Sequence, residues 1–489
     1  MNYKKKSNTN GLEDNVRHAI EELSRDLRAN KFVNGQMQFT DITNRDYFLK
    51  AYGDRIRYCI MWNKFLIWNG TSWEIDKKGR VEENCVDFVH EMYRGLRVIN
   101  DRQLADAFEK HLIKSESFRR IQAIVGLLKM SRTIKISDDE LDTDNYLFNV
   151  KGTTLDLRNG KGLKPDPKHL ITKQSKFVYQ QDAKCPTWDM FLMQIFNNDY
   201  DLIHFVQKAM GYSLSGDVSE QCLFILWGTG ANGKSTFLNV LQELFGDYAC
   251  STGTETFMKK TSEQSNDLAR LRGMRLVTTS EAEQGKALSE SLIKQITGED
   301  ELTARFLYGE YFSFKPTFKI YMATNHKPRI KGADNGIWRR IKLIPFTVTI
   351  PPEQRDKQLT EKLLAENSGI LNWLLQGYTL WKKEGLIEPD VIKEANEEYR
   401  YDMDSIQAFI NEVLNIDATQ KWRLPTKDLY DVYLRWCGKN NEKALSQKGL
   451  AVRMQEKGYK RGVSNSVRFW LGLGIKPEWL AVMQKKTLY

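Results

Sequence analysis

A glycine-rich loop between an apolar run and an amphipathic run constrains the fold of this chain more than any other feature. The stretch is CLFILWGTGANGKSTFLNVLQELFG, residues 222–246. Gly228, four further residues and then Gly233-Lys234-Ser235 satisfy the pattern G-x-x-x-x-G-K-[ST]. Glycines let successive backbone N–H groups turn toward one anion, and the following helix adds the positive end of its dipole. The stretch therefore predicts a buried strand, a phosphate-binding loop and a helix, in that order.

The residue types in this loop predict ATP and Mg²⁺ as cofactors. Lys234 would reach the β- and γ-phosphates as a point charge, and the Ser235 hydroxyl would hold Mg²⁺. A chance glycine turn before a helix is the alternative, and the strand and helix on its two sides make that alternative weaker. The predicted nucleotide-binding residues are Gly228, Thr229, Gly230, Ala231, Asn232, Gly233, Lys234, Ser235 and Thr236.

Composition bounds the class of protein. With 489 residues, 41% apolar and 28% charged, the chain has material for about three domains. It has no run of about 18 apolar residues, and its first ten residues lack an apolar signal core, so we expect a cytoplasmic protein with no membrane partner. The 6 cysteines form no C-x-x-C pair, which argues against a zinc site and a disulfide framework.

Apolar patterning predicts an α/β centre between two smaller parts. Short apolar runs alternate with helical segments there, as in a mostly parallel sheet flanked by helices. We expect an N-terminal α+β domain over 1–190, a central domain over 191–400 and a C-terminal domain over 401–489. Central strands are predicted at 222–227, 275–280, 318–324 and 340–346.

The C-terminal part carries most of the net charge of +10, with 15 Lys and Arg against 7 Asp and Glu from residue 405 onward. Two helical segments followed by the basic hairpin KRGVSNSVRFWLGL are the pattern of a winged helix, and such a surface would bind duplex DNA through phosphates. A small helical cap with merely solvated basic residues is the alternative. The predicted DNA contacts are Arg453, Lys457, Lys460, Arg461 and Arg468.

Further polar residues come at the ends of the other predicted strands. The segment RLVTTSEAEQG carries Glu281, the better candidate for a carboxylate beside Mg²⁺, and Glu283 as the second. FKIYMATNHKP ends a buried strand at Asn325, whose amide could sense the γ-phosphate and help to place water. GIWRRIKLIPF presents Arg339 and Arg340 before the next strand. Together with Lys234, these are the predicted catalytic residues, in the order and spacing of a ring ATPase.

With these segments in view, the chain resembles a superfamily-3 helicase of the phage and poxvirus primase–helicase type. GTGANGKST, SEAEQG, LIKQITGEDELTARFLYGEYFSF, ATNHKP and GIWRRIKLIPF are similar to the motifs of that family. FNVKGTTLDLRNG and ITKQSKFVYQQDAKCPTW resemble the domain that precedes the ATPase in such proteins. The resemblance covers roughly residues 50–400, with a weaker match in the basic C-terminus.

Two departures from the family pattern affect the interpretation. Ala282 separates Glu281 from Glu283, whereas the two acids adjoin in the viral members, so the division of roles between them stays open. A separate N-terminal primase, present in members that prime DNA, has no counterpart in the first 190 residues. The resemblance thus implies the helicase portion of such a protein, from a phage or mobile genetic element.

The resemblance implies an AAA+-like P-loop core and a hexameric ring that moves 3′→5′ on single-stranded DNA and unwinds duplex during replication, alone or with other replication proteins. Arg340 would complete the site of the neighbouring subunit, with Arg339 as the second choice. A hairpin over 301–314 would enter the channel, with Phe306, Leu307 and Phe312 in the core. A ring-shaped remodeller or packaging motor, or a DNA-binding regulator in which ATP controls only assembly, remains an alternative. The resemblance places further DNA contacts at Lys294, Arg305 and Tyr308.

Overall fold

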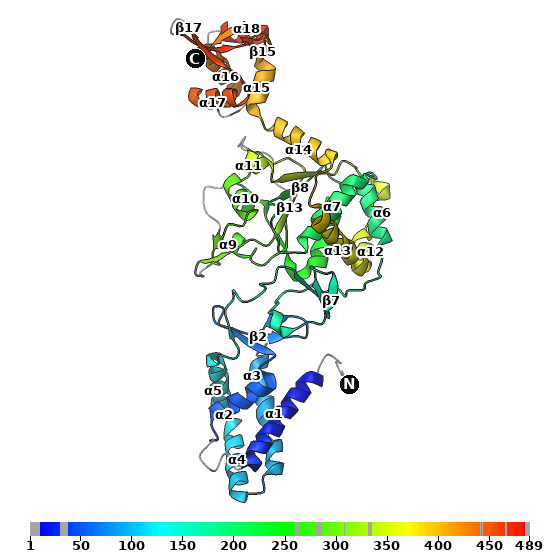
Figure 1. The fold of residues 1–489 in the computed structure, drawn as a ribbon, viewed down its shortest axis with the longest axis vertical. Coiled ribbons are helices and arrows are strands. Elements are labelled where there is room, and N and C mark those ends of the chain that lie inside the picture. Colours follow the sequence, from blue (N-terminus) through cyan, green and yellow to red (C-terminus); the bar gives the residue numbers. More distant parts are fainter. Residues whose placement is uncertain are drawn as a thin grey trace.

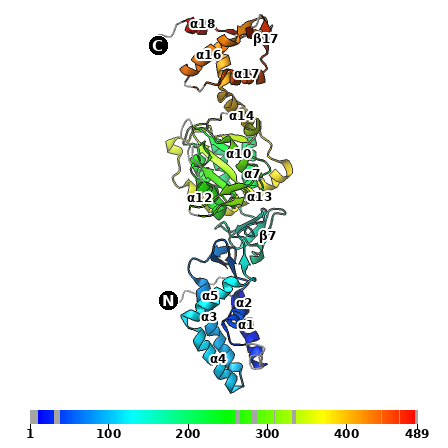
Figure 2. The ribbon, with the colours of Figure 1, turned by 90° about the vertical axis from the view of Figure 1, so that its left-hand side faces the viewer.

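The structure is a computed structural model in which three groups of elements follow one another along a long axis (Figure 1). N-terminal helices lie at one end, a parallel sheet with its helices lies in the middle, and a small C-terminal group lies at the other end (Figures 1 and 2). The structure describes residues 10–29, 38–259, 265–279, 286–307, 309–330, 335–440, 442, 444–464 and 467–484.

Amphipathic helices and a small mixed sheet form the N-terminal group. On the first helix Ala19, Ile20, Leu23 and Leu27 are buried, a spacing that places them on one helix face. The sheet has the order β3-β2-β1-β4, and its strands β1, β2 and β3 pair antiparallel with their neighbours in chain order. The elements are α1 (Asn10–Arg28), α2 (Asp41–Tyr52), β1 (Ile56–Cys59), β2 (Lys64–Trp68), β3 (Trp73–Ile75), α3 (Arg80–Met92), η1 (Tyr93–Val98), α4 (Arg102–Ser115), α5 (Phe118–Met130) and β4 (Lys135–Ile136).

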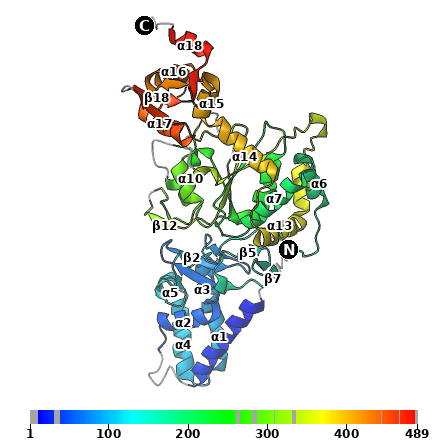
Figure 3. The same ribbon diagram turned by 45° about the horizontal axis from the view of Figure 1, so that its top comes forward.

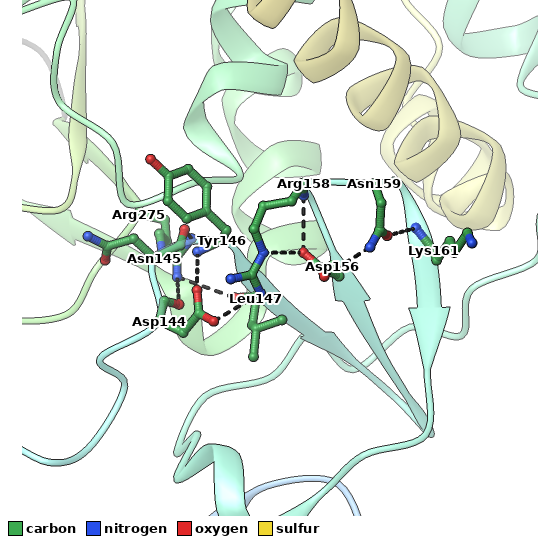
Figure 4. A network of polar contacts seen from close by, with 9 residues as sticks. All are labelled: Asp144, Asn145, Tyr146, Leu147, Asp156, Arg158, Asn159, Lys161 and Arg275. Atoms are coloured by element: carbon green, nitrogen blue, oxygen red, sulfur yellow. Dashed lines mark hydrogen bonds and ion pairs between the residues drawn. The ribbon is translucent and has the colours of Figure 1, made fainter.

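A second small sheet joins this group to the centre. It consists of the antiparallel strands β5 (Leu147–Val150), β6 (Thr153–Asp156) and β7 (Lys161–Leu163), followed by the short helix η2 (Pro167–His169). Arg158 pairs with Asp144 (3.0 Å) and Asp156 (2.7 Å), while Arg275, from the start of a central strand, donates to the carbonyl oxygen of Asn145 (2.6 Å) (Figure 4). The small sheet is therefore fastened directly to the central sheet.

The central sheet is five-stranded and parallel throughout, in the order β14-β8-β13-β10-β9. Because all its strands run the same way, their carboxyl ends meet at one edge. Four strands match the predicted apolar runs, and the edge strand β9 is an addition. The strands are β8 (Leu223–Trp227), β9 (Ala249–Thr252), β10 (Leu276–Thr279), β13 (Lys319–Thr324) and β14 (Ile341–Pro345).

Both faces of this sheet are buried, which explains why its strands are apolar without alternation. Leu223 and Ile225 of β8 pack into one hydrophobic cluster, and Phe224 and Leu226 pack into another on the opposite face. Helices α7 and α13 pack closely against each other beside the sheet (Figure 3). The remaining central elements are α6 (Pro186–Ile195), α7 (Tyr200–Ser213), α8 (Lys234–Phe245), η3 (Gly246–Tyr248), η4 (Thr254–Phe257), α9 (Ser265–Ala269), α10 (Glu290–Ile296), β11 (Leu302–Ala304), β12 (Phe312–Phe314), α11 (Asn335–Trp338), η5 (Pro352–Gln354), α12 (Leu359–Ala365) and α13 (Asn367–Glu384).

Helix α14 (Asp390–Asp402) leads from the centre to the C-terminal group (Figure 1). In that group an antiparallel sheet of order β16-β18-β17 packs with helices, and β15 pairs with β19. The elements are α15 (Ser405–Val413), β15 (Leu414–Ile416), β16 (Arg423–Pro425), α16 (Thr426–Lys439), α17 (Gln447–Glu456), β17 (Arg461–Ser464), β18 (Val467–Leu471), β19 (Leu473–Ile475) and α18 (Pro477–Gln484).

The prediction of a mixed α/β chain with a parallel sheet is confirmed. The domain boundaries stay predictions, and one packing fact bears on where the centre begins. Phe148, Leu155 and Trp188 belong to the same hydrophobic cluster as Phe224 of the central sheet, so the central core draws on residues before 190. In the part of the chain that the structure describes, no helix is long and apolar enough to cross a membrane.

Candidate functional site

The glycine-rich loop leaves the central strand β8 at the carboxyl edge of the sheet and enters helix α8 at Lys234. Strands β13 and β14 lie on the two sides of β8. The loop is tied to both neighbours, because Gly228 N donates to the Thr324 carbonyl (3.3 Å) and Phe346 N donates to the Trp227 carbonyl (2.7 Å). Residues that follow three strands are thereby gathered at one point.

Two positions in the loop require glycine for reasons of space. A Cβ atom at Gly228 would lie 2.2 Å from the carbonyl oxygen of Phe346 and 2.4 Å from Nδ2 of Asn232. Gly233 has φ of 84°, and a Cβ there would lie 2.5 Å from Cγ2 of Ile195 in α6. Since backbone and helix α6 close on the loop from both sides, a side chain at either position would displace it.

The segment that follows β14 braces the loop from one side. Asn232 donates from Nδ2 to the Phe346 carbonyl (3.1 Å), and Ile350 N donates to the Ala231 carbonyl (2.8 Å). Ala231 has φ of 51°, in the left-handed region. These bonds fix the path of the loop before it reaches Lys234.

Lys234 is 5% exposed, and its ammonium group contacts three oxygen atoms. Nζ donates to the Gly228 carbonyl (2.7 Å), to Oδ1 of Asn232 (3.1 Å) and to Oδ1 of Asn325 (3.2 Å). Asn325 lies 91 residues further along the chain. The structure thus brings together the lysine and the amide that two separate motifs predict as site residues.

A small turn after β13 holds Asn325 at this edge. Oγ1 of Thr324 donates to the His326 carbonyl (2.6 Å) and accepts from His326 N (3.1 Å). Thr324 is completely buried, so the turn is anchored in the core while the next residue faces the loop. The position of Asn325 is therefore set by the end of its strand.

The remaining loop residues fit a phosphate group. Gly230 has φ of 107° and open space around its Cα, and Ser235 is exposed on the first turn of α8. Thr229 is exposed and Thr236 is half-buried, one on each side of these residues. Backbone N–H groups at a helix N-terminus together with a lysine are the donor set that phosphates prefer.

Glu281 and Glu283 lie outside the described residues. Strand β10 ends two residues before Glu281, at Thr279, on the same edge of the sheet as the loop.

The arginine pair lies at the opposite edge of the sheet. The Arg340 carbonyl accepts from Leu223 N (2.7 Å) at the start of β8, so about 16 Å of strand separates it from the loop. Arg340 is 9% exposed and donates to the Thr297 hydroxyl (3.1 Å) and the Gly336 carbonyl (2.6 Å). Arg339 is exposed and donates to Oε1 of Gln221 (2.7 Å). Sequence alone does not distinguish these neighbours.

Another cation at this amino edge is held by carbonyl groups. Lys319, the first residue of β13, donates from Nζ to the carbonyl oxygens of Ser215 (2.5 Å) and Asp217 (2.9 Å). Burial, with the nearby charge of Arg275, holds the pKa of Lys319 well below its ordinary value. This contact fastens the segment after α7 to the amino edge of the sheet, which is the edge away from the glycine-rich loop.

The predicted hairpin is present as the antiparallel strands β11 and β12. Near the tip of the hairpin, Arg305 lies over the ring of Tyr311, 4.8 Å from its centroid. Lys294 is half-buried on α10, and Tyr308 is outside the described residues. The prediction that Phe306 and Leu307 pack into the core is wrong, since they are 50% and 71% exposed. They sit beyond the paired strands, where the tip extends past the core, whereas Phe312 packs partly against it.

The C-terminal cations predicted to bind DNA divide into a bonded group and an exposed group. In the bonded group, Lys457 contacts Asp404 and Oε1 of Gln407 (3.0 Å), so it ties α17 to the start of α15. Arg453 pairs with Glu456 of its own helix (3.1 Å). The exposed group, together with a lysine on the first turn of α17, is named the C-terminal cation set: Lys448, Lys460, Arg461 and Arg468.

Cross-strand register places Arg461 and Arg468 on one face of the β17–β18 hairpin. Lys448 was not predicted from the sequence as a DNA contact. The only signal for it is its position two residues after Ser446, which caps helix α17. Lys327 was also missed, although it follows Asn325 by two residues in ATNHKP. Its ammonium lies 4.7 Å from the centroid of the Trp227 ring.

Comparison with protein families gives three matches along the chain. The "D5 N terminal like" family matches residues 45–197, and a family of unknown function, DUF5906, matches residues 226–340. The "Poxvirus D5 protein-like" family matches residues 401–465. The D5-type matches thus lie on both sides of the central sheet.

Curated relatives come from large DNA viruses. "Putative helicase L207/L206" of Acanthamoeba polyphaga mimivirus is 30% identical over 325 residues, which are 61% of this chain and 34% of that protein. "Putative helicase 022R" of Frog virus 3 is 26% identical, over 54% of this chain and 29% of the relative. "Putative primase C962R" of African swine fever virus is 20% identical, over 73% and 39%. The chain spans well under half the length of these three relatives.

Among solved structures, the apo C-terminal region of NrS-1 has a similar fold. It superposes with a TM-score of 0.50 at 10% identity, covering 86% of this chain and 96% of that one. At this identity the likeness concerns the fold alone. The D5-type matches and the viral relatives support assignment of the chain to the primase–helicase family of the phage and poxvirus type.

Proposed function

We propose that this chain is the ATP-driven motor part of a replicative DNA helicase. The observation that carries the proposal is the contact between Lys234 Nζ and Asn325 Oδ1 at 3.2 Å, at the carboxyl edge of a parallel sheet. The strand order, in which the loop-bearing strand lies between the last strand and the sensor strand, supports an AAA+-like P-loop core. A nucleoside triphosphate bound to the loop would have its terminal phosphate beside Lys234 and Asn325.

The loop residues would bind ATP and act on its γ-phosphoryl group. Lys234 would exchange its present oxygen partners for phosphate oxygens and stabilise the charge that develops there. Asn325 would orient the attacking water, and one carboxylate of Glu281 and Glu283 would assist. The Ser235 hydroxyl and Glu281 would hold Mg²⁺, which would supply positive charge against the negative phosphates.

The arginine pair supports a ring. Because Arg339 and Arg340 lie at the edge of the sheet away from their own loop, they are suited to complete the site of a neighbouring subunit. Arg339 is the better candidate for direct contact, since it is exposed and donates to the Gln221 side chain, whereas Arg340 is buried and also donates to Thr297 and Gly336. Head-to-tail repetition of this contact would give a closed hexamer.

DNA would contact two separate parts of the chain. The β11–β12 hairpin, with Arg305 and exposed Phe306 at its tip, would follow single-stranded DNA in the channel. The C-terminal group has the element order of a winged helix, and the C-terminal cation set would bind duplex phosphates. Translocation is expected to run 3′→5′.

The test combines hydrolysis, assembly and strand separation. Full-length protein should hydrolyse ATP faster with single-stranded DNA, form rings in electron micrographs, and displace a strand from a duplex with a 3′ tail. Lys234→Ala should lose hydrolysis and displacement together. Hydrolysis by rings that never separate strands, with either tail polarity, would favour the remodeller or packaging motor instead. ATP binding without turnover would favour the regulator.

A further inference from the structure

One largely buried lysine lies between the predicted nucleotide site and the last turn of helix α14. Lys327 follows Asn325 by two residues, and its side chain is 10% exposed. Its ammonium lies 4.7 Å from the ring centroid of Trp227, the residue directly before Gly228 of the loop. The cation thus packs against the base of the loop and extends from the strand that carries the sensor amide.

The other side of the same ammonium faces the last turn of helix α14. Nζ pairs with Oδ2 of Asp402 (2.9 Å) and lies 3.8 Å from Oε1 of Glu398. The ring of Tyr399 completes the surroundings, 5.7 Å from Nζ. One positive charge therefore links the loop and the sensor strand to the end of α14.

This last turn also holds the arginine segment. The hydroxyl of fully buried Tyr399 donates to the Pro328 carbonyl, and its ring meets the Trp338 ring edge-on at 5.3 Å. Arg400 donates from Nη2 to Oδ1 of Asn335 (2.7 Å). Trp338 directly precedes Arg339. The last turn of α14 therefore supports both the nucleotide site of its own subunit and the arginine pair proposed to act in the site of the neighbouring subunit.

No flexible linker separates this turn from the C-terminal group. Met403 packs against the hydrophobic cluster on one face of the central sheet, and Asp404 already caps helix α15 through Gln407 N (3.0 Å). The Asp404 carboxylate also bonds to Lys457 at the end of α17. Helix α14 runs from the central sheet to this junction (Figures 1 and 3). A shift of the last turn would move α15 and α17 with it.

We propose that Lys327 is a positioning residue that couples the nucleotide site to the C-terminal DNA-binding group, an inference that rests on the proposed function. Nucleotide on the loop changes the placing of Trp227 and Asn325, and the ammonium passes that change to Asp402. The last turn of α14 and the Asp404–Lys457 contact then reposition α17. Coupling of this kind is reciprocal, so duplex DNA on the C-terminal group changes nucleotide affinity by the same factor.

The test measures the coupling factor and not activity alone. It is the ratio of the duplex-DNA dissociation constants of the full chain without and with a saturating non-hydrolysable ATP analogue. For the wild type we expect about 5-fold or more. Lys327→Met should bring the factor close to 1, while affinity for each ligand alone changes less. Lys327→Arg should restore most of it, because a guanidinium keeps the charge and stacks on aromatic rings.

A matched control lies on the first turn of the same helix. Lys393 pairs with Asp390 (2.9 Å) and is 54% exposed, so Lys393→Met removes a lysine from α14 without touching the junction. It should leave the coupling factor unchanged. Hydrogen exchange of nucleotide-free protein gives a second readout, since Lys327→Met should raise exchange over 398–404 by about tenfold, or about 1.4 kcal/mol.

The outcomes separate this inference from the proposed function. Wild-type protein that binds and hydrolyses ATP but shows a coupling factor of 1 would overturn the inference and leave the proposed function standing. The inference is likewise overturned if Lys327→Met keeps the wild-type coupling factor, whatever its hydrogen exchange. Wild-type protein that does not bind the analogue would overturn both.

Discussion

Gly228→Ala tests how tightly the loop is closed by the segment after β14. The added Cβ would lie 2.2 Å from the Phe346 carbonyl oxygen, whereas real Cβ contacts are not found under 3.0 Å, and the obstacle is backbone. Relief requires the loop and Phe346 to separate, which breaks the bonds from Phe346 N to Trp227 O, from Asn232 to Phe346 O and from Ile350 N to Ala231 O. At about 1 kcal/mol for each hydrogen bond, the closed loop loses about 2–4 kcal/mol.

This loss should fall on binding more than on global stability, because the buried strands remain intact. A penalty of about 2–4 kcal/mol corresponds to a rise of about 30- to 1,000-fold in the dissociation constant of a fluorescent ATP analogue. The melting temperature should shift by only a few degrees. Gly253→Ala is the matched control, since nothing lies within 4 Å of its Cβ position and its φ is −66°. Wild-type nucleotide affinity in Gly228→Ala would refute the closed-loop geometry.

Further predictions address the catalytic, ionisable and DNA-contacting groups. Arg339→Ala should lose turnover but keep ATP binding and stability, and mixing it with Lys234→Ala protein should restore some hydrolysis; failure of confirmed mixed rings to recover would exclude a trans role. Arg340→Ala should instead lower the free energy of unfolding by about 1–3 kcal/mol in urea titrations, since it strips buried acceptors of their donor; an unchanged midpoint would contradict this. Burial raises the pKa of Cys222 to about 12, so above pH 9 the unfolded chain loses a proton that the folded chain keeps. Stability should then fall by about 1.4 kcal/mol per pH unit from this group, and Cys222→Ala should show a shallower loss between about pH 9 and 11. Substituting the C-terminal cation set by alanine should lower the log–log salt slope of duplex binding by about 0.9 for each phosphate that the variant no longer neutralises, and an unchanged slope would favour the helical-cap alternative.

Local features of the fold could be predicted from the sequence because their causes are local. The loop pattern indicates that the backbone needs glycine at Gly228 and Gly233. Continuous apolar runs indicate strands buried on both faces. The turn at Asn159-Gly160 follows from the same turn chemistry, since Gly160 has φ of 68° between two antiparallel strands. The proximity of Lys234 and Asn325 could be expected as well, because the carboxyl ends of parallel strands meet at one edge.

Contacts between distant segments were decided only by the tertiary structure. Arg339 and Arg340 are identical and adjacent, yet the start of β14 directs one outward and buries the other against Thr297. Lys457 has the positive charge expected of a DNA contact, but its ammonium group bonds to Asp404, 53 residues earlier in the chain. Sequence pattern reports which side chains prefer burial or charge. Which partner each one finds depends on how whole elements pack, and that information lies in no single stretch of the chain.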